Sequence, residues 1–202
     1  MNHKMVLHEL GPGHDFWAGR LPDFFFLDGE EFTSLWNVHP KEYHEIRVPG
    51  GKLVKTPRWQ QAYGKDYTFT GRVSKALPLD TLTGPVPKVG RIVAWCRGAI
   101  DGRLNGLLLN WYDGALGHYI GKHNDSTTSM VVGAPIVTIS FGETRRFRLR
   151  PPKGQSGFLD FEAADGAVFV MPYDTNLAWT HEVPKEAKRR GRRISITLRA
   201  FH

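Results

Sequence analysis

Residues 193–199, RISITLR, alternate strictly between polar and aliphatic side chains. Successive side chains of a β-strand point to opposite faces, so this stretch predicts a strand with one aliphatic face and one polar face. The aliphatic face carries Ile194, Ile196 and Leu198, and the polar face carries Arg193, Ser195, Thr197 and Arg199. Two interpretations of the polar face stay open: it lies in water, or it forms the floor of a pocket in which a planar guanidinium group holds a carboxylate.

Other short β-prone runs precede this strand, and clusters of Gly, Pro and Asp separate them. The runs span residues 107–112, 136–141, 147–149, 158–161, 167–171 and 179–183, and the last one, 194–201, overlaps the alternating stretch. Many short strands at this spacing predict a β-sandwich or a double-sheet jelly roll, the architecture also called a double-stranded β-helix.

Two helices are expected before residue 107. Asp28 and Glu31 have the spacing of a capping box, and the apolar residues behind them share one face, so a helix is predicted to start near Asp28. A second helical pattern covers residues 89–96 and ends near Gly98. We expect both helices to pack on the outside of one sheet. The predicted fold class is therefore α+β and β-dominated, with a jelly-roll core and flanking N-terminal helices.

The segments around these helices predict turns and loops. Residues 48–52, VPGGK, are typical of a hairpin turn, and residues 77–88 contain three prolines and predict an irregular loop. No linker-like stretch or internal repeat divides the chain of 202 residues. We therefore expect residues 1–202 to form a single domain.

Composition limits the classes of partner. The chain has 27 Lys and Arg residues against 20 Asp and Glu residues, a net charge of +7. This balance favours an anionic partner, nucleic acid first, although many basic proteins bind none. No apolar run approaches the roughly 18 residues of a membrane span, so no membrane association is expected. Cys96 is the only cysteine, which favours a reducing compartment: the cytoplasm, or the nucleus in a eukaryote. We expect a monomer.

The tripeptide His123-Asn124-Asp125 is the sharpest local feature. In an extended segment the first and third side chains point to the same face, so His123 and Asp125 can converge on one metal ion while Asn124 points away. His181 is the candidate for a third ligand. Two histidines and one carboxylate make the facial triad of non-heme Fe(II) oxygenases, which leaves positions open for a cosubstrate and O₂. The alternatives are a surface loop for the tripeptide and an ordinary hydrogen-bonded histidine for His181.

Taken together, these motifs resemble those of the AlkB family of nucleic-acid dealkylases, in particular its animal homologue-2 and homologue-3 branch. The resemblance extends from about Pro57 to Phe201, and the motifs occur in the family's order. Residues 57–71 resemble the nucleotide-recognition segment, 110–112 the N-x-Y strand, 123–125 the H-x-D motif, 135–142 the strand that follows it, and 193–199 the closing R-x-N-x-T-x-R. His181 matches the distal histidine. The resemblance divides the domain into residues 1–106, with the helices and the nucleotide-recognition segment, and residues 107–202, the jelly-roll catalytic core.

The resemblance implies Fe(II), 2-oxoglutarate and O₂ as cofactors, and it implies a role for each candidate residue. The catalytic metal ligands would be His123, Asp125 and His181. The residues that hold 2-oxoglutarate would be Asn110, Tyr112, Arg193, Ser195, Thr197 and Arg199, with Arg193 at the distal carboxylate and Asn110 and Arg199 at the chelating end. The substrate base would lie against Arg58, Tyr67, Phe69 and Thr127, with Phe69 stacking on it opposite His123.

Two positions depart from the family pattern. Ser195 stands where the family usually has Asn. Thr127 stands where the repair enzymes commonly carry an acidic residue that reads the base edge, so we expect a weaker preference for cationic bases. The implied reaction is oxidative dealkylation of N-alkylated bases in DNA or RNA, with release of succinate, CO₂ and formaldehyde. The alternatives are an AlkB-type oxygenase that acts on a small molecule or a protein, and a catalytically silent jelly-roll binding module.

Overall fold

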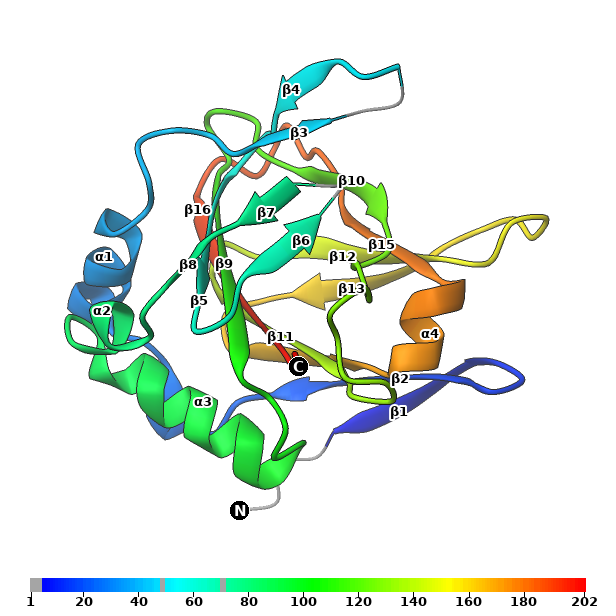
Figure 1. Cartoon of the computed structure of the whole chain (residues 1–202), viewed down its shortest axis with the longest axis horizontal. Helices are drawn as coiled ribbons and strands as arrows, with labels where there is room; N and C mark the ends of the chain where they lie inside the picture. Colours follow the sequence, from blue (N-terminus) through cyan, green and yellow to red (C-terminus); the bar gives the residue numbers. More distant parts are fainter. Residues whose placement is uncertain (1–4, 48–49, 70–71) are drawn as a thin grey trace.

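Two β-sheets lie face to face in the computed structural model, which describes residues 5–47, 50–69 and 72–202 (Figure 1). The larger sheet has eight strands in the order β1-β2-β14-β11-β16-β9-β5-β8. Its strands are β1 (Val6–Gly11), β2 (His14–Arg20), β5 (Trp59–Tyr63), β8 (Ala76–Leu77), β9 (Gly106–Asp113), β11 (Ile136–Gly142), β14 (Ala167–Met171) and β16 (Arg192–Arg199). All neighbours pair antiparallel except β5 and β8.

The smaller sheet has four antiparallel strands in the order β10-β15-β12-β13. Its strands are β10 (Ile120–His123), β12 (Arg145–Arg150), β13 (Leu159–Ala163) and β15 (Thr180–Val183). A hydrophobic cluster with residues from both sheets, among them Phe16, Phe147 and Phe169, fills part of the space between them. The predicted β-dominated jelly roll is therefore confirmed.

Strand β16 has the alternation that its sequence predicts. Ile194, Ile196 and Leu198 belong to the cluster beneath the helices, whereas the polar residues on the other face line a pocket between the sheets. Arg193 is 1% exposed and Arg199 is 3% exposed. Of the two interpretations of the polar face, the pocket floor is correct, and the face in water is wrong.

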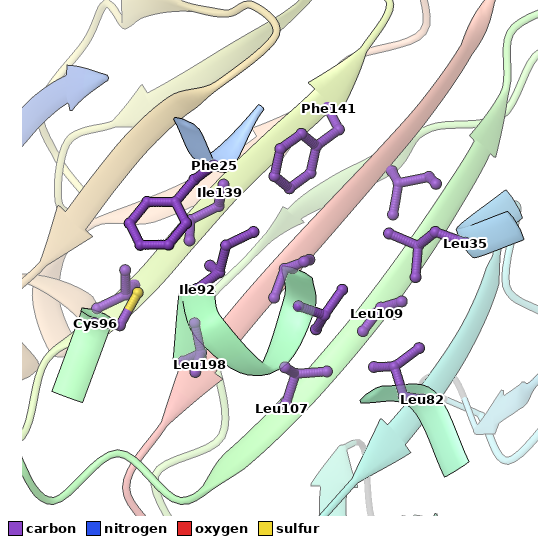
Figure 2. Close-up of a cluster of buried hydrophobic side chains, with 14 of the residues drawn as sticks. Phe25, Leu35, Leu82, Ile92, Cys96, Leu107, Leu109, Ile139, Phe141 and Leu198 are labelled. Carbon is purple, nitrogen blue, oxygen red and sulfur yellow. The ribbon is translucent and has the colours of Figure 1, made fainter. Parts of the chain in front are cut away.

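Two helices cover the outer face of the larger sheet. Helix α1 (Gly29–Asn37) begins at Asp28, whose carboxylate accepts the backbone N–H groups of Glu30 and Glu31, while Glu31 accepts the N–H of Asp28. This is the predicted capping box. Helix α3 (Pro87–Ala99) matches the second predicted helix. Figure 2 shows how residues of these helices, such as Leu35 and Ile92, meet Leu109 and other side chains of the sheet.

Several elements differ from the sequence-based expectation. The residue range 77–88 is not one irregular loop, because it contains helix α2 (Asp80–Thr83) and the start of α3. Pro87 occupies the first turn of α3, where the backbone N–H groups have no partner within the helix, so the missing N–H of proline breaks no hydrogen bond. This proline therefore begins a helix and not the loop that was predicted. Strands β1, β2, β5 and β8 were not expected, and they add residues from before position 107 to the larger sheet.

The remaining elements are two small hairpins and short helical turns. Strands β3 (Glu45–Arg47) and β4 (Leu53–Lys55) pair antiparallel around the predicted turn, of which Val48 and Pro49 lie outside the described residues. Strands β6 (Tyr67–Phe69) and β7 (Arg72–Ser74) form a second hairpin. A 3-10 turn, η1 (Asp23–Phe25), precedes α1, and α4 (Tyr173–Ala178) precedes β15. Across the described ranges, every helix is too short or too polar to cross a membrane.

Candidate active site

His123, Asp125 and His181 meet in the pocket between the two sheets. Strands β10 and β15 pair antiparallel with His123 directly opposite His181, and Asp125 follows two residues after the end of β10. The Nε2 atoms of His123 and His181 lie 3.7 Å and 4.0 Å from the Asp125 carboxylate. One potential ligand atom from each residue lies within 4.8 Å of the other two, which is a spacing that a single cation can bridge.

Both imidazoles are in the form that binds a metal. The Nδ1–H of His123 donates to the Gly121 carbonyl at 2.8 Å, so the Nε2 lone pair is free on the side of Asp125. Burial and the neighbouring His181 lower the pKa of His123 to about 3. Burial likewise lowers the pKa of His181. Two neutral imidazoles and a carboxylate are the donor set of a non-heme Fe(II) site, so these residues fit the implied metal.

A buried arginine keeps Asp125 ionised. Arg199 donates to the Asp125 carboxylate from Nε at 3.0 Å and from Nη2 at 2.5 Å, and the Tyr67 hydroxyl donates to its other oxygen at 3.2 Å. Burial alone would raise the pKa of Asp125, but the positive charge of Arg199 holds that pKa below its usual value. The carboxylate is therefore ready to bind a cation.

The backbone of Asp125 is held by a residue that the sequence reasoning missed. Asn176, in α4, is fully buried; its side-chain oxygen accepts the Asp125 N–H at 2.9 Å, and its side-chain nitrogen donates to the Asp125 carbonyl at 3.1 Å. Asn124 points away from the metal ligands, as predicted, and donates to the carbonyls of Asn176 and Trp179. Hydrogen bonds of Asn124 and Asn176 thus connect α4 to the tripeptide of residues 123–125. No local sequence motif predicts this contact.

Arg193 is a buried cation without an acidic partner among the residues that the structure describes. Its Nε donates to the Ser140 hydroxyl at 2.9 Å, and its guanidinium lies 5.0 Å from the centroid of the Tyr112 ring. Its Nη1 is buried and has no hydrogen-bond partner within residues 5–47, 50–69 and 72–202. A buried, unpaired charge is costly, so the site is complete only with an anion beside Arg193. A dicarboxylate such as 2-oxoglutarate fits this requirement.

One pocket between the sheets collects all of the predicted site residues except Thr127. It is lined by Arg58, Tyr67, Phe69, Asn110, Tyr112, His123, Asp125, His181, Arg193, Ser195, Thr197 and Arg199. Within it, Arg58 donates from Nε to the side-chain oxygen of Asn110 at 2.7 Å, so the predicted base pocket and the predicted cosubstrate pocket share a hydrogen bond. Sequence reasoning missed Gln60, which also lines the pocket and is 5% exposed.

Two substrate-binding candidates lie differently from the expected arrangement. Thr127 is half-buried outside the pocket lining, in a turn where its carbonyl accepts the Met130 N–H at 3.1 Å. The rings of Phe69 and His123 lie 5.6 Å apart at 81°. A base stacked between two parallel rings needs about 7 Å, twice an ordinary carbon contact. These rings must therefore move apart before a base can lie between them.

Comparison with known proteins agrees with the chemistry of this pocket. Residues 32–199 match the 2OG-Fe(II) oxygenase superfamily. The chain therefore belongs to the 2OG-Fe(II) oxygenase superfamily. The Fe(II), 2-oxoglutarate and O₂ expected from the sequence are the cofactors that this membership implies.

Individual relatives narrow the family. The chain is 30% identical over 159 residues to the DNA oxidative demethylase ALKBH2 of Homo sapiens, which covers 74% of this chain and 58% of that protein. It is 31% identical over 106 residues to the alpha-ketoglutarate-dependent dioxygenase alkB homolog 3 of Rattus norvegicus, which covers 48% of this chain and 36% of that protein. The chain thus spans less than two thirds of the length of these relatives. Their names confirm the resemblance to the AlkB family.

A solved structure confirms the fold. The structure of OsALKBH1 superposes with a TM-score of 0.55 at 17% sequence identity, over 96% of this chain and all of that chain.

Proposed function

We propose that this protein is an Fe(II)- and 2-oxoglutarate-dependent oxygenase that removes alkyl groups from the nitrogens of nucleobases in DNA or RNA. The proposal rests on one observation: a single pocket holds a His-Asp-His triad together with the buried cation of Arg193, which has no acidic partner among the described residues. The triad suits a ferrous ion, and Arg193 suits the distal carboxylate of the keto acid that chelates it.

Different residues of the pocket bind the metal ion and the 2-oxoglutarate. His123, Asp125 and His181 hold the ion, and Arg199 and Tyr67 keep the Asp125 carboxylate ionised and oriented. Arg193 anchors the far end of 2-oxoglutarate, beside Tyr112 and Ser195. When bound, the iron supplies the activation of O₂ that oxidises the alkyl carbon. One O₂ and one 2-oxoglutarate are consumed for each N-methyl group, and succinate, CO₂ and formaldehyde are released as the nitrogen regains its hydrogen.

The substrate class follows from the relatives and from the aromatic residues of the pocket. The human relative is a DNA oxidative demethylase, and Tyr67 and Phe69 lie beside the triad. A base in a duplex cannot reach this pocket, so it must be unpaired or flipped, which costs a few kcal/mol and least for a lesion that no longer pairs. Stacking on an aromatic ring returns about 1–3 kcal/mol of that cost. The basic balance of the chain, +7, supports an anionic polymer as substrate.

We further propose that residues 1–202 act as one domain and as a monomer. The larger sheet draws strands from both sides of residue 106, so neither part completes the sheet without the other. Cys96 is buried and unpaired, which suits a reducing compartment such as the cytoplasm or, in a eukaryote, the nucleus.

Mass spectrometry of methylated oligonucleotides tests the proposed function. DNA and RNA strands carrying 1-methyladenine or 3-methylcytosine are incubated with the protein, Fe(II), 2-oxoglutarate and ascorbate. We expect loss of 14 mass units (about one CH₂, the net change of a demethylation) with formation of succinate. The His123→Ala variant should give neither product. Succinate without demethylation of any strand would move the substrate to a small molecule or a protein, and absence of both products would refute the oxygenase.

A further inference from the structure

A second groove lies beside the catalytic pocket and shares no lining residue with it. Its walls are the end of the β3–β4 hairpin at Lys55, the loop of residues 116–119, and Lys185 in the segment between β15 and β16. Figure 1 shows the hairpin and this segment at the same end of the molecule. The groove adjoins the catalytic pocket along the chain, because Tyr119 lines the groove and the next residue, Ile120, lines the pocket.

Two ammonium groups line this groove without a carboxylate partner in the described part of the chain. Lys55 and Lys185 are both exposed, and neither ammonium group takes part in an ion pair or a hydrogen bond there. Glu45 lies directly opposite Lys55 in the β3–β4 hairpin, but the two side chains form no ion pair. Lys185 is placed by its packing over Gly117, where an added Cβ would lie 3.1 Å from the lysine Cε. Gly117 also has a φ of +70°, which favours glycine, so the loop leaves room for the lysine stem.

A third donor is fixed by an internal hydrogen-bond chain. The backbone N–H of Asp113 donates to Nδ1 of His118 at 3.0 Å, so a neutral His118 carries its proton on Nε2. That Nε2–H donates to the Tyr43 hydroxyl oxygen at 3.0 Å. The hydroxyl hydrogen of Tyr43 is therefore left for another acceptor. Burial lowers the pKa of His118, which favours the neutral ring with its single N–H, and burial raises the pKa of Tyr43, which favours the protonated hydroxyl.

Aromatic packing holds this chain in place and offers a stacking surface. The Tyr43 ring stacks on Trp59 at 5.4 Å and 8°, and Trp59 meets His118 edge-on at 4.8 Å. Tyr119 is 38% exposed at the groove, and its backbone N–H donates to the Pro57 carbonyl at 3.0 Å. The groove thus combines two exposed lysine ammonium groups, one oriented hydroxyl donor and one exposed ring.

We propose that this groove binds a phosphodiester group of the nucleic-acid strand, next to the nucleotide whose base enters the catalytic pocket. Lys55, Lys185 and the hydroxyl of Tyr43 are the donors to the phosphate oxygens. Tyr119 gives a face on which a neighbouring base can stack. The assignment rests on the proposed function, because it requires a nucleic-acid substrate.

The test compares two double variants that remove the same amount of charge. Lys55→Gln with Lys185→Gln removes both groove cations, and Arg91→Gln with Arg97→Gln removes two exposed cations from α3, on the outer face of the larger sheet. Binding of a fluorescent methylated single strand is measured by anisotropy over a series of salt concentrations. The groove variant should bind about tenfold more weakly, and its salt slope should fall by about 0.7 for each phosphate that a lysine no longer neutralises. The α3 variant should match the wild type.

The Tyr43→Phe variant tests the contribution of the hydroxyl donor alone, because both lysine charges are kept. It should weaken binding several-fold with an unchanged salt slope, because it removes a neutral donor. Turnover of 2-oxoglutarate without nucleic acid should stay at the wild-type rate in all these variants.

The outcomes separate the groove from the proposed function. If the groove variant binds like the α3 variant, the groove assignment is wrong while the proposed function stands. If the wild type binds neither DNA nor RNA, the proposed substrate class is wrong. An equal loss of affinity for a free 5′-mononucleotide would mean that the groove takes a free phosphate, and it would overturn the assignment to a strand.

Discussion

At the scale of single residues, the pocket depends on how its buried charges are paired. Arg199 and Asp125 neutralise each other, with the carboxylate fixed by two guanidinium nitrogens. Arg193 has no acidic partner among the described residues: its Nε donates to the Ser140 hydroxyl, its guanidinium lies near the Tyr112 ring, and its Nη1 lacks a hydrogen-bond partner there. The difference separates two roles. One arginine positions a protein carboxylate, and the other is available to the carboxylate of a ligand.

Replacing Arg193 by Lys tests the second role. The charge is kept, but a point charge cannot reproduce the planar fork that holds a carboxylate through two hydrogen bonds. Losing one charge-assisted hydrogen bond costs about 1.5–3 kcal/mol, so the KM for 2-oxoglutarate should rise roughly 10- to 100-fold. Steady-state kinetics measures the KM, and Mn(II) affinity, which should not change, is the control. An unchanged KM would show that another residue binds the distal carboxylate of 2-oxoglutarate.

We propose that Asn176 is a positioning residue, because its side chain holds the backbone of Asp125, a candidate metal ligand. Asn176→Ala should weaken Mn(II) binding about 10- to 100-fold, as is typical for residues that orient a metal ligand. Asn105→Ala is the matched control, because Asn105 makes the same pair of bonds with the backbone of Phe201, both at 2.8 Å. Both variants should lose similar thermal stability, but only the first should lose metal affinity. Equal Mn(II) affinities, titrated by electron paramagnetic resonance, would reduce Asn176 to a structural residue.

At the scale of elements, sequence predicts what is encoded locally. The capping box at Asp28 and the alternation of residues 193–199 each lie within one segment, and both are confirmed. Strands β1 and β2 were missed because most of their residues are only partly buried or exposed, so their hydrophobic alternation is weak. The approach of Asn176 to Asp125 joins residues 51 positions apart, and only the folded chain brings them together.

The last residue of β11, Gly142, offers a test at this scale. Gly142 has a φ of +83°, and an added Cβ would lie 2.4 Å from the Arg192 carbonyl oxygen, beside the strand that carries Arg193. Gly133 has a φ of +74° with open space around it. Gly133→Ala should cost only the left-handed backbone strain, about 1–2 kcal/mol.

Gly142→Ala adds the backbone clash to the same strain, and it should lower the Tm at least twice as much as Gly133→Ala in calorimetry. It should also raise the KM for 2-oxoglutarate, because the clash shifts the strand beneath Arg193. Equal Tm losses in the two variants would show that the turn has room to relax.

At the scale of the whole molecule, we expect ligands that bind in the pocket to raise the free energy of unfolding. Two neutral histidines face a carboxylate, and a buried guanidinium nitrogen lacks a partner within the described residues. A ligand that binds only the folded state stabilises it by about 2.7 kcal/mol when present at 100 times its Kd. We therefore expect the candidate metal and keto-acid ligands to couple the stability of the fold to the binding of both.

Thermal unfolding should reveal this coupling in two separate steps. Mn(II) should raise the Tm through His123, Asp125 and His181, and 2-oxoglutarate should raise it further through Arg193. At 100 times the Kd, each step should amount to roughly 5–10 °C, since 1 kcal/mol shifts the Tm of a domain this size by about 2–4 °C. Arg193→Lys should keep the Mn(II) step and lose most of the 2-oxoglutarate step, whereas His123→Ala should lose most of both, because the keto acid chelates the metal. If 2-oxoglutarate stabilises Arg193→Lys as strongly as the wild type at the same concentration, Arg193 does not bind it, and its unpaired nitrogen serves another anion.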